Sequence, residues 1–164
     1  MAKTAFKGVV TNTVGELPKV GSKAIAFELV AGDLSVKTLD SYSGKKKVIT
    51  INPSYDTGVC QTTARTFNQR LAERKDVVVL IVSADLPFAQ GRFCEAEGLS
   101  NVVALSSFRS TFGKDYGVNL VDGVLQGLTA RAVLVVDENN TVKHAELVSE
   151  ITTEPNYDAA LAAL

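Results

Sequence analysis

The chain of 164 residues is long enough to bury a hydrophobic core, and we expect a single domain spanning residues 1–164. Hydrophobic residues make up 46% of the sequence and charged residues 21%, values that are typical of a globular protein. Because 17 Lys and Arg nearly balance 18 Asp and Glu, the formal net charge is -1, which argues against nucleic acid or an anionic membrane as a partner.

Neither targeting nor metal binding is indicated. No stretch approaches the ~20 apolar residues that span a bilayer, and the N-terminus lacks the apolar region of a secretion signal. We therefore expect a cytoplasmic protein with thiols that are reduced at rest. A structural zinc site uses about four Cys or His ligands, and the chain offers Cys60, Cys94 and His144. We expect no metal and no cofactor, although the two cysteines could form a transient disulfide.

The first part of the chain predicts short strands. Residues 4–14 have the pattern of a β-hairpin with Gly8 near the bend. Residues 21–44 predict two further short strands around a turn at Gly32, followed by a brief helical turn. The β-branched, apolar run at 47–52 is typical of a buried central strand.

A helix is predicted over residues 57–73. Apolar residues there recur at i, i+4, i+7 and i+11, which forms a stripe along one helical face: Cys60, Ala64, Phe67 and Leu71. Residues 76–85 are a second continuous apolar strand. Strand, helix and strand at this spacing predict a right-handed βαβ unit with parallel strands.

Capping signals predict a second helix after this unit. Asp85 stands at an N-cap position, Pro87 falls in the first turn, and Gly98 is a natural end. Beyond it, the sequence predicts a short strand at 101–106, a hairpin over 130–150 and a final amphipathic helix over 156–164. This order indicates an α/β sheet covered by helices and is compatible with a thioredoxin-like core.

Cys60 falls in the first turn of the predicted helix 57–73, where unpaired backbone N–H groups and the helix dipole favour an anion. A cysteine at a helix N-terminus is commonly available as the reactive thiolate. Thr57 can bring its hydroxyl near the sulfur, and Pro53 can shield the sulfur without consuming a donor. However, the apolar stripe that Cys60 begins supports a buried structural cysteine equally well.

Cys94 lies on the second predicted helix, 34 residues after Cys60, so the pair is not a CxxC motif. Gly91 and Gly98 weaken this helix, and local unfolding could release the thiol at modest cost. The alternative is that Cys94 fills a gap beside Phe93. Its position alone leaves both interpretations open.

The His and Arg residues of the chain bear on which reaction a nucleophilic cysteine could catalyse. A cysteine hydrolase needs a base, most often His, but His144 lies in an alternating strand pattern typical of a surface or edge position. A nucleophile without a base must be activated by its surroundings, which suits thiolate redox chemistry. Arg131, at the start of a predicted strand beside Gly127, could stabilise a thiolate and hold an oxyanion, and Arg109 is a weaker candidate.

The segment PSYDTGVC resembles the active-site pattern of peroxiredoxins, with Pro53, Thr57 and Cys60 in register. Four further segments are similar to the thiol peroxidase subfamily, over nearly the whole chain: SADLPFAQGRFCEAEGL, GLTARAV, DENNTV and EITTEPNYDAALA. The resemblance implies a thioredoxin-like fold, with a central mixed sheet flanked by helices and an N-terminal hairpin extension. It also implies a homodimer.

The resemblance further implies reduction of hydrogen peroxide and organic hydroperoxides, with thioredoxin as the reductant. By position, Cys60 is the peroxidatic cysteine and Cys94 is the resolving cysteine of an intramolecular disulfide. Thr57 and Arg131 are expected to position the peroxide oxygens and stabilise the thiolate, while Pro53 shields it.

The implied cycle follows from sulfur chemistry. Attack on the O–O bond gives a Cys60 sulfenic acid, Cys94 condenses with it, and an external dithiol restores both thiols. We expect a folded reduced form and a locally unwound oxidised form. Asn52 departs from the family, whose members usually carry an apolar residue before the proline. Two other hypotheses remain: a redox sensor or interaction module without sustained turnover, and a thioredoxin-like fold with inert cysteines.

Overall fold

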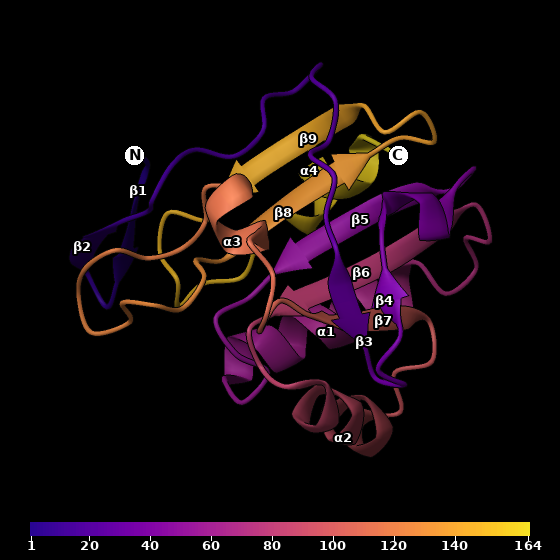
Figure 1. Cartoon of the computed structure of the whole chain (residues 1–164), viewed down its shortest axis with the longest axis horizontal. Helices are drawn as coiled ribbons and strands as arrows, with labels where there is room; N and C mark the ends of the chain where they lie inside the picture. The colour runs from indigo at the N-terminus through magenta and orange to yellow at the C-terminus, as the bar shows by residue number, and fades with distance from the viewer.

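A seven-stranded mixed sheet forms the centre of the computed structural model, which describes residues 1–164 (Figure 1). The strands are β3 (Leu29–Ala31), β4 (Val36–Lys37), β5 (Lys46–Ile51), β6 (Val77–Ser83), β7 (Val102–Ser106), β8 (Ala132–Val136) and β9 (Val142–Leu147). Their order across the sheet is β4-β3-β7-β6-β5-β8-β9. β5, β6 and β7 are parallel, whereas β3, β4, β8 and β9 pair antiparallel. The predicted mixed α/β sheet is confirmed.

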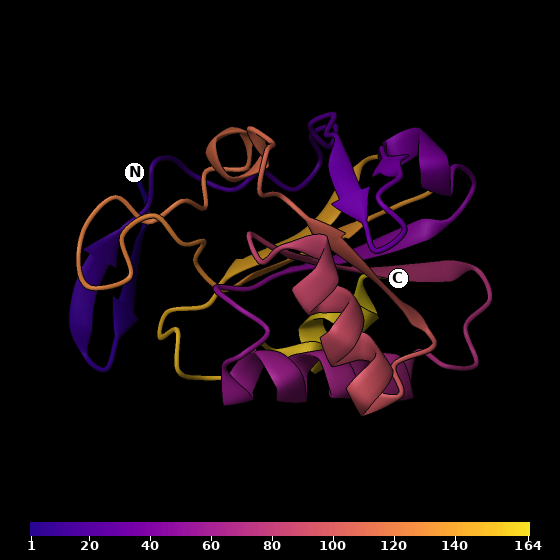
Figure 2. The same cartoon turned by 60° about the horizontal axis from the view of Figure 1, so that its bottom comes forward.

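Helices cover both faces of this sheet. The helices are α1 (Gly58–Arg70), α2 (Pro87–Glu97), α3 (Phe112–Asp115), α4 (Tyr157–Ala162) and a 3₁₀ turn η1 (Leu39–Tyr42). Figure 2 shows α1, α2 and α4 on one face and α3 on the other. No helix has the length and apolar character needed to cross a bilayer.

The two faces of the sheet bury two hydrophobic clusters, because alternate strand residues point to opposite sides. Ile49 and Ile51 of β5 pack in the cluster that contains Phe112. Val48, the residue before Ile49, points to the other side and packs in the cluster that contains Phe67 of α1. The central strand predicted at 47–52 is therefore buried on both faces, as its continuous apolar run indicated.

Helix α1 follows the predicted stripe. Its buried face consists of four residues that are each at most 6% exposed: Cys60, Ala64, Phe67 and the C-cap residue Leu71. The helix ends at Arg70, three residues before the predicted end at residue 73. β5, α1 and β6 form the predicted βαβ unit, since β5 and β6 pair in parallel from Lys46 and Val77 onward.

The predicted N-terminal hairpin is also present. β1 (Lys3–Phe6) and β2 (Val9–Asn12) pair antiparallel around Lys7 and Gly8, which both have positive φ. Figure 1 shows the hairpin beside the end of the sheet, next to the loop that leads into β8. Two backbone hydrogen bonds attach it to the segment that follows β9: Ala5 N donates to the Ser149 carbonyl, and the Ala5 carbonyl accepts from Ile151 N.

One prediction is wrong, and one helix was not foreseen. Asp85 is not the N-cap of α2, because the helix begins at Pro87 with Leu86 at the N-cap. The Asp85 carboxylate instead accepts hydrogen bonds from Ser54 Oγ, Tyr55 N and Ser83 Oγ. Helix α3 was not predicted, since four residues hold too little apolar periodicity to signal a helix.

Candidate active site

The turn between β5 and α1 sets the backbone around Cys60. Thr57 is the N-cap of α1, and its Oγ1 accepts a hydrogen bond from the Cys60 backbone N at 3.4 Å. An N-cap side chain satisfies one of the N–H groups that have no helical partner. The Thr57 hydroxyl thus contacts the backbone of Cys60, and it donates to the Ser54 carbonyl at 3.2 Å.

Arg131 lies against the sulfur of Cys60. Its Nη1 donates to Cys60 Sγ at 3.3 Å, and its Nε donates to the Ile151 carbonyl at 2.9 Å. Both Cys60 and Arg131 are only 1% exposed. A buried guanidinium at this distance stabilises negative charge on the sulfur, because the interaction is little screened by water. The geometry therefore suits a thiolate nucleophile.

Asn52 completes the surroundings of Arg131. Its Oδ1 accepts a hydrogen bond from Arg131 Nη1 at 3.1 Å, while its Nδ2 donates to the Thr50 carbonyl at 3.3 Å. The side chain is 1% exposed. Sequence reasoning singled out Asn52 as a departure from the family but could not foresee this contact, which joins residues 79 apart in the chain.

A cavity of about 280 Å³ opens beside the turn. Its lining includes Pro53, Thr57 and Arg131, together with the apolar residues Leu128 and Ile151. Arg131 Nη2 makes no hydrogen bond to the protein, so a guanidinium edge remains free for a ligand with acceptor oxygens. Pro53 is buried and contributes an apolar wall that has no N–H to satisfy.

Cys94 occupies a different setting, on α2. It is half-buried and packs with Phe93 against the cluster that contains Phe67. Burial raises the pKa of the Cys94 thiol above its ordinary value. Both cysteines are free thiols in this structure. The αL residue Gly98 ends α2, as predicted.

Tyr55 links the surroundings of the two cysteines. Its ring lies 4.9 Å from that of Phe93, and its hydroxyl donates to the Ile81 carbonyl at 2.8 Å. Burial raises the pKa of Tyr55 well above its ordinary range, and nearby negative charge on Cys94, Asp85 and Cys60 adds to the effect. Sequence reasoning missed Tyr55, whose only signal was its place inside the conspicuous turn.

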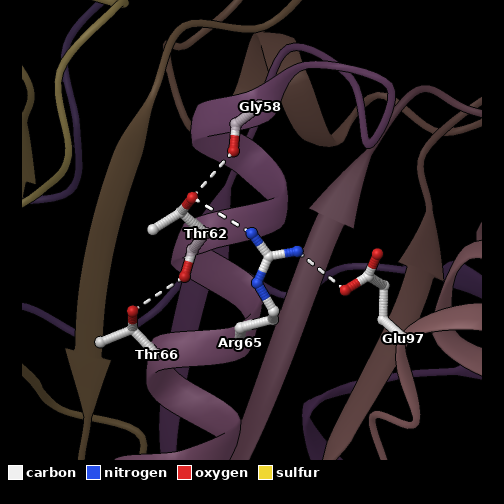
Figure 3. A network of polar contacts seen from close by, with 5 residues as sticks. All are labelled: Gly58, Thr62, Arg65, Thr66 and Glu97. Atoms are coloured by element: carbon white, nitrogen blue, oxygen red, sulfur yellow. Dashed lines mark hydrogen bonds and ion pairs between the residues drawn. The ribbon is translucent and has the colours of Figure 1, made fainter.

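A polar network connects the two cysteine-bearing helices, as Figure 3 shows. Arg65 Nη1 of α1 forms an ion pair with Glu97 Oε2 at 2.8 Å, and Glu97 is the last residue of α2. Arg65 Nη2 also donates to Thr62 Oγ1 at 3.4 Å, and that hydroxyl donates to the Gly58 carbonyl at 3.0 Å. The end of α2 is thus tethered to the first turns of α1.

Two other charged candidates lie elsewhere. Arg109 is exposed, stacks on Phe108 at 5.5 Å and borders a separate cavity with Phe27. His144 lies on the edge strand β9 opposite Val135, with Nε2 3.9 Å from Glu146. Neither residue contacts Cys60, and no imidazole base accompanies the sulfur.

Known proteins place these features in a family. Residues 19–161 match the Redoxin family. Thiol peroxidases of Corynebacterium glutamicum and Mycobacterium tuberculosis are each 54% identical over 164 residues, covering 100% of this chain and 99% of theirs. A peroxiredoxin-like protein from Aquifex aeolicus has a TM-score of 0.91 at 41% identity, over 96% of this chain and 92% of that one. A thiol peroxidase from Chromobacterium violaceum shares the fold, with a TM-score of 0.89 at 24% identity over 98% and 93% of the two chains. The chain therefore belongs to the Redoxin family, and it is a peroxidase of the thiol peroxidase type.

Proposed function

We propose that this peroxidase reduces hydrogen peroxide and organic hydroperoxides through Cys60 and recovers through an intramolecular disulfide with Cys94. The single observation that carries the proposal is the buried contact of 3.3 Å between Arg131 Nη1 and Cys60 Sγ at the start of α1. The relatives named thiol peroxidase support it, because their similarity extends over the entire chain.

In the first step, the Cys60 thiolate attacks one oxygen of the O–O bond. The S–O bond forms as the O–O bond breaks, and the departing oxygen takes up a proton and leaves as water or an alcohol. The sulfur is oxidised by two electrons to a sulfenic acid. Arg131 and Thr57 line the cavity and would hold the peroxide oxygens, while Pro53, which also lines it, would shield the sulfur from bulk water.

In the second step, Cys94 attacks the sulfenic sulfur, which forms a disulfide and releases water. A disulfide requires the two sulfurs to approach to about 2.05 Å. Because Cys60 is held against Arg131 and Cys94 packs beside Phe93, we expect the segment that carries Cys94 to unwind locally when the disulfide forms. A dithiol of thioredoxin then reduces the disulfide by thiol exchange and regenerates both cysteines.

The proposal includes a homodimer and a cytoplasmic location. Val9, Val10 and Val124 are 69%, 61% and 86% exposed around the N-terminal hairpin, and a second copy would cover such an apolar surface. Sedimentation of the purified protein over a range of concentrations tests the dimer, and a monomer at every concentration would contradict it.

Peroxide consumption coupled to thioredoxin, thioredoxin reductase and NADPH tests the cycle. Cys60→Ser is expected to abolish turnover. Cys94→Ser is expected to react once with peroxide, because Cys60 remains, but to lose turnover driven by thioredoxin. Full turnover in Cys60→Ser would rule out the proposal, and oxidation of the wild type without sustained turnover would favour a redox sensor instead.

A further inference from the structure

The hydrogen bonds of Arg131 divide its guanidinium into fixed and free parts. Nε is fixed by the Ile151 carbonyl at 2.9 Å. Nη1 has two hydrogens, and both are in use: one contacts Cys60 Sγ at 3.3 Å and the other Asn52 Oδ1 at 3.1 Å. Since the guanidinium is planar, these contacts together determine which way its free edge faces.

Asn52 is itself held firmly. Its backbone N donates to the Val82 carbonyl at 2.9 Å, and its own carbonyl accepts from Thr129 Oγ1 at 2.8 Å. The side-chain amide can lie only one way round, because Nδ2 faces the Thr50 carbonyl while Oδ1 faces the guanidinium of Arg131. If the amide were flipped, Nδ2 would face the N–H groups of Arg131, and two hydrogen-bond donors would oppose each other.

The acceptors around Arg131 are neutral. Neither the Ile151 carbonyl nor the Asn52 amide carries a charge, and Arg131 takes part in no ion pair with a carboxylate. The positive charge of this 1% exposed side chain is therefore available to the Cys60 sulfur. An apolar residue in place of Asn52 could pack here but could not accept a hydrogen bond from Nη1.

We propose that Asn52 is a positioning residue, which orients Arg131 toward Cys60 without neutralising its charge. The inference rests on the proposed role of Cys60 as nucleophile. Asn52 makes no hydrogen bond to the sulfur and does not line the cavity, so its effect would pass through Arg131. Its two properties, an acceptor oxygen and the lack of charge, can be separated by substitution.

The test uses the Cys94→Ser background, in which Cys60 is the only thiol. The pH dependence of its alkylation reports the thiolate, and the second-order rate of its oxidation by hydrogen peroxide reports reactivity. Asn52→Asp keeps the acceptor but adds a negative charge beside Arg131, and thiolate formation is expected to move up by about one pH unit. Asn52→Leu leaves the charge of Arg131 unchanged but removes the acceptor that helps to fix the orientation of its guanidinium. Oxidation of Cys60 by hydrogen peroxide is therefore expected to slow about tenfold.

Thr129→Val is the matched control, because it removes a hydrogen bond to the Asn52 carbonyl without touching Arg131. The pH dependence of Cys60 alkylation in this variant should match that of the Cys94→Ser parent. The inference is overturned if Asn52→Asp and Asn52→Leu behave as the parent does, or if Thr129→Val shifts the profile as much. Should Asn52→Asp fail to fold, Asn52→Leu decides by the same two measurements. Turnover is not needed for either readout, so a failure of the peroxidase cycle would be recognised separately.

Discussion

The helices that carry the two cysteines are attached to the protein very differently. α1 buries Cys60, Thr63, Ala64 and Phe67, whereas α2 buries only Pro87 and Gln90. Cys60 is held by the Thr57 cap, the apolar stripe of α1 and the guanidinium of Arg131, while Cys94 is half-buried on a helix that contains glycine at position 91. The difference suits the proposed cycle, in which Cys60 stays in place and the segment that carries Cys94 moves.

The largest expected effect is on stability and comes from truncating Phe67, which packs α1 against the sheet. Phe67→Ala should lower the free energy of unfolding by about 3–5 kcal/mol, because Phe67 is fully buried between the helix and the sheet. Phe93→Ala, on the surface of α2 that is only partly buried, should cost clearly less. Urea unfolding of both variants measures the contrast, and equal losses would contradict it.

Arg131 gives the next largest effect. Arg131→Lys keeps the charge but loses the planar fork that reaches Cys60, Asn52 and the Ile151 carbonyl together. The value of kcat/KM for peroxide should fall by about 10²–10³-fold, as when a preorganised donor is removed from an active site. Arg109→Lys, at a separate exposed position, is the control and should retain activity.

A smaller effect tests the movement of α2. Gly91→Ala should stabilise the helix by about 0.5–1 kcal/mol, since nothing lies within 4 Å of the added Cβ. Disulfide formation after oxidation should slow about two- to fivefold, because unwinding α2 becomes costlier. Oxidation of Cys60 should keep its rate. Rapid quenching followed by mass analysis separates the two steps, and unchanged disulfide formation would show that α2 need not unwind.

The smallest effect concerns the tether between the helices. Arg65→Gln removes the ion pair with Glu97, which is partly exposed, so disulfide formation should accelerate by only about twofold. High salt should produce a similar acceleration in the wild type. Arg74→Gln, which breaks the exposed pair with Asp76 elsewhere, serves as the control. A slower reaction in Arg65→Gln would show that the tether assists the approach instead of restraining it.

Much of this molecule follows from local sequence patterns. The period of 3.6 residues located α1 and its buried stripe, and continuous apolar runs located β5 and β6. Such signals are local, so the sequence alone reveals them. The contact between Arg131 and Cys60 joins residues 71 apart, and only the pairing of β5 with β8 brings them together. Residue type suggested Arg131, but no local pattern could supply its distance.

Asp85 illustrates a second limit. Its position before a proline is typical of an N-cap, yet its carboxylate turns back to the loop that follows β5 and accepts from Ser54 and Tyr55. Capping and loop binding compete for the same oxygens, and the choice depends on which donors the fold brings near. The sequence near Asp85 contains neither donor, because both lie about thirty residues earlier.

The attachment of the N-terminal hairpin has a practical consequence for handling this protein. The backbone of Ala5 in β1 accepts a hydrogen bond from Ile151 N at 2.8 Å, and the Ile151 carbonyl in turn holds Arg131 Nε at 2.9 Å. Two hydrogen bonds thereby connect the first strand to the guanidinium that contacts Cys60 Sγ. A truncation that displaces Ala5 would disturb the contacts that hold Arg131, so the first strand should be kept intact when the protein is shortened or tagged.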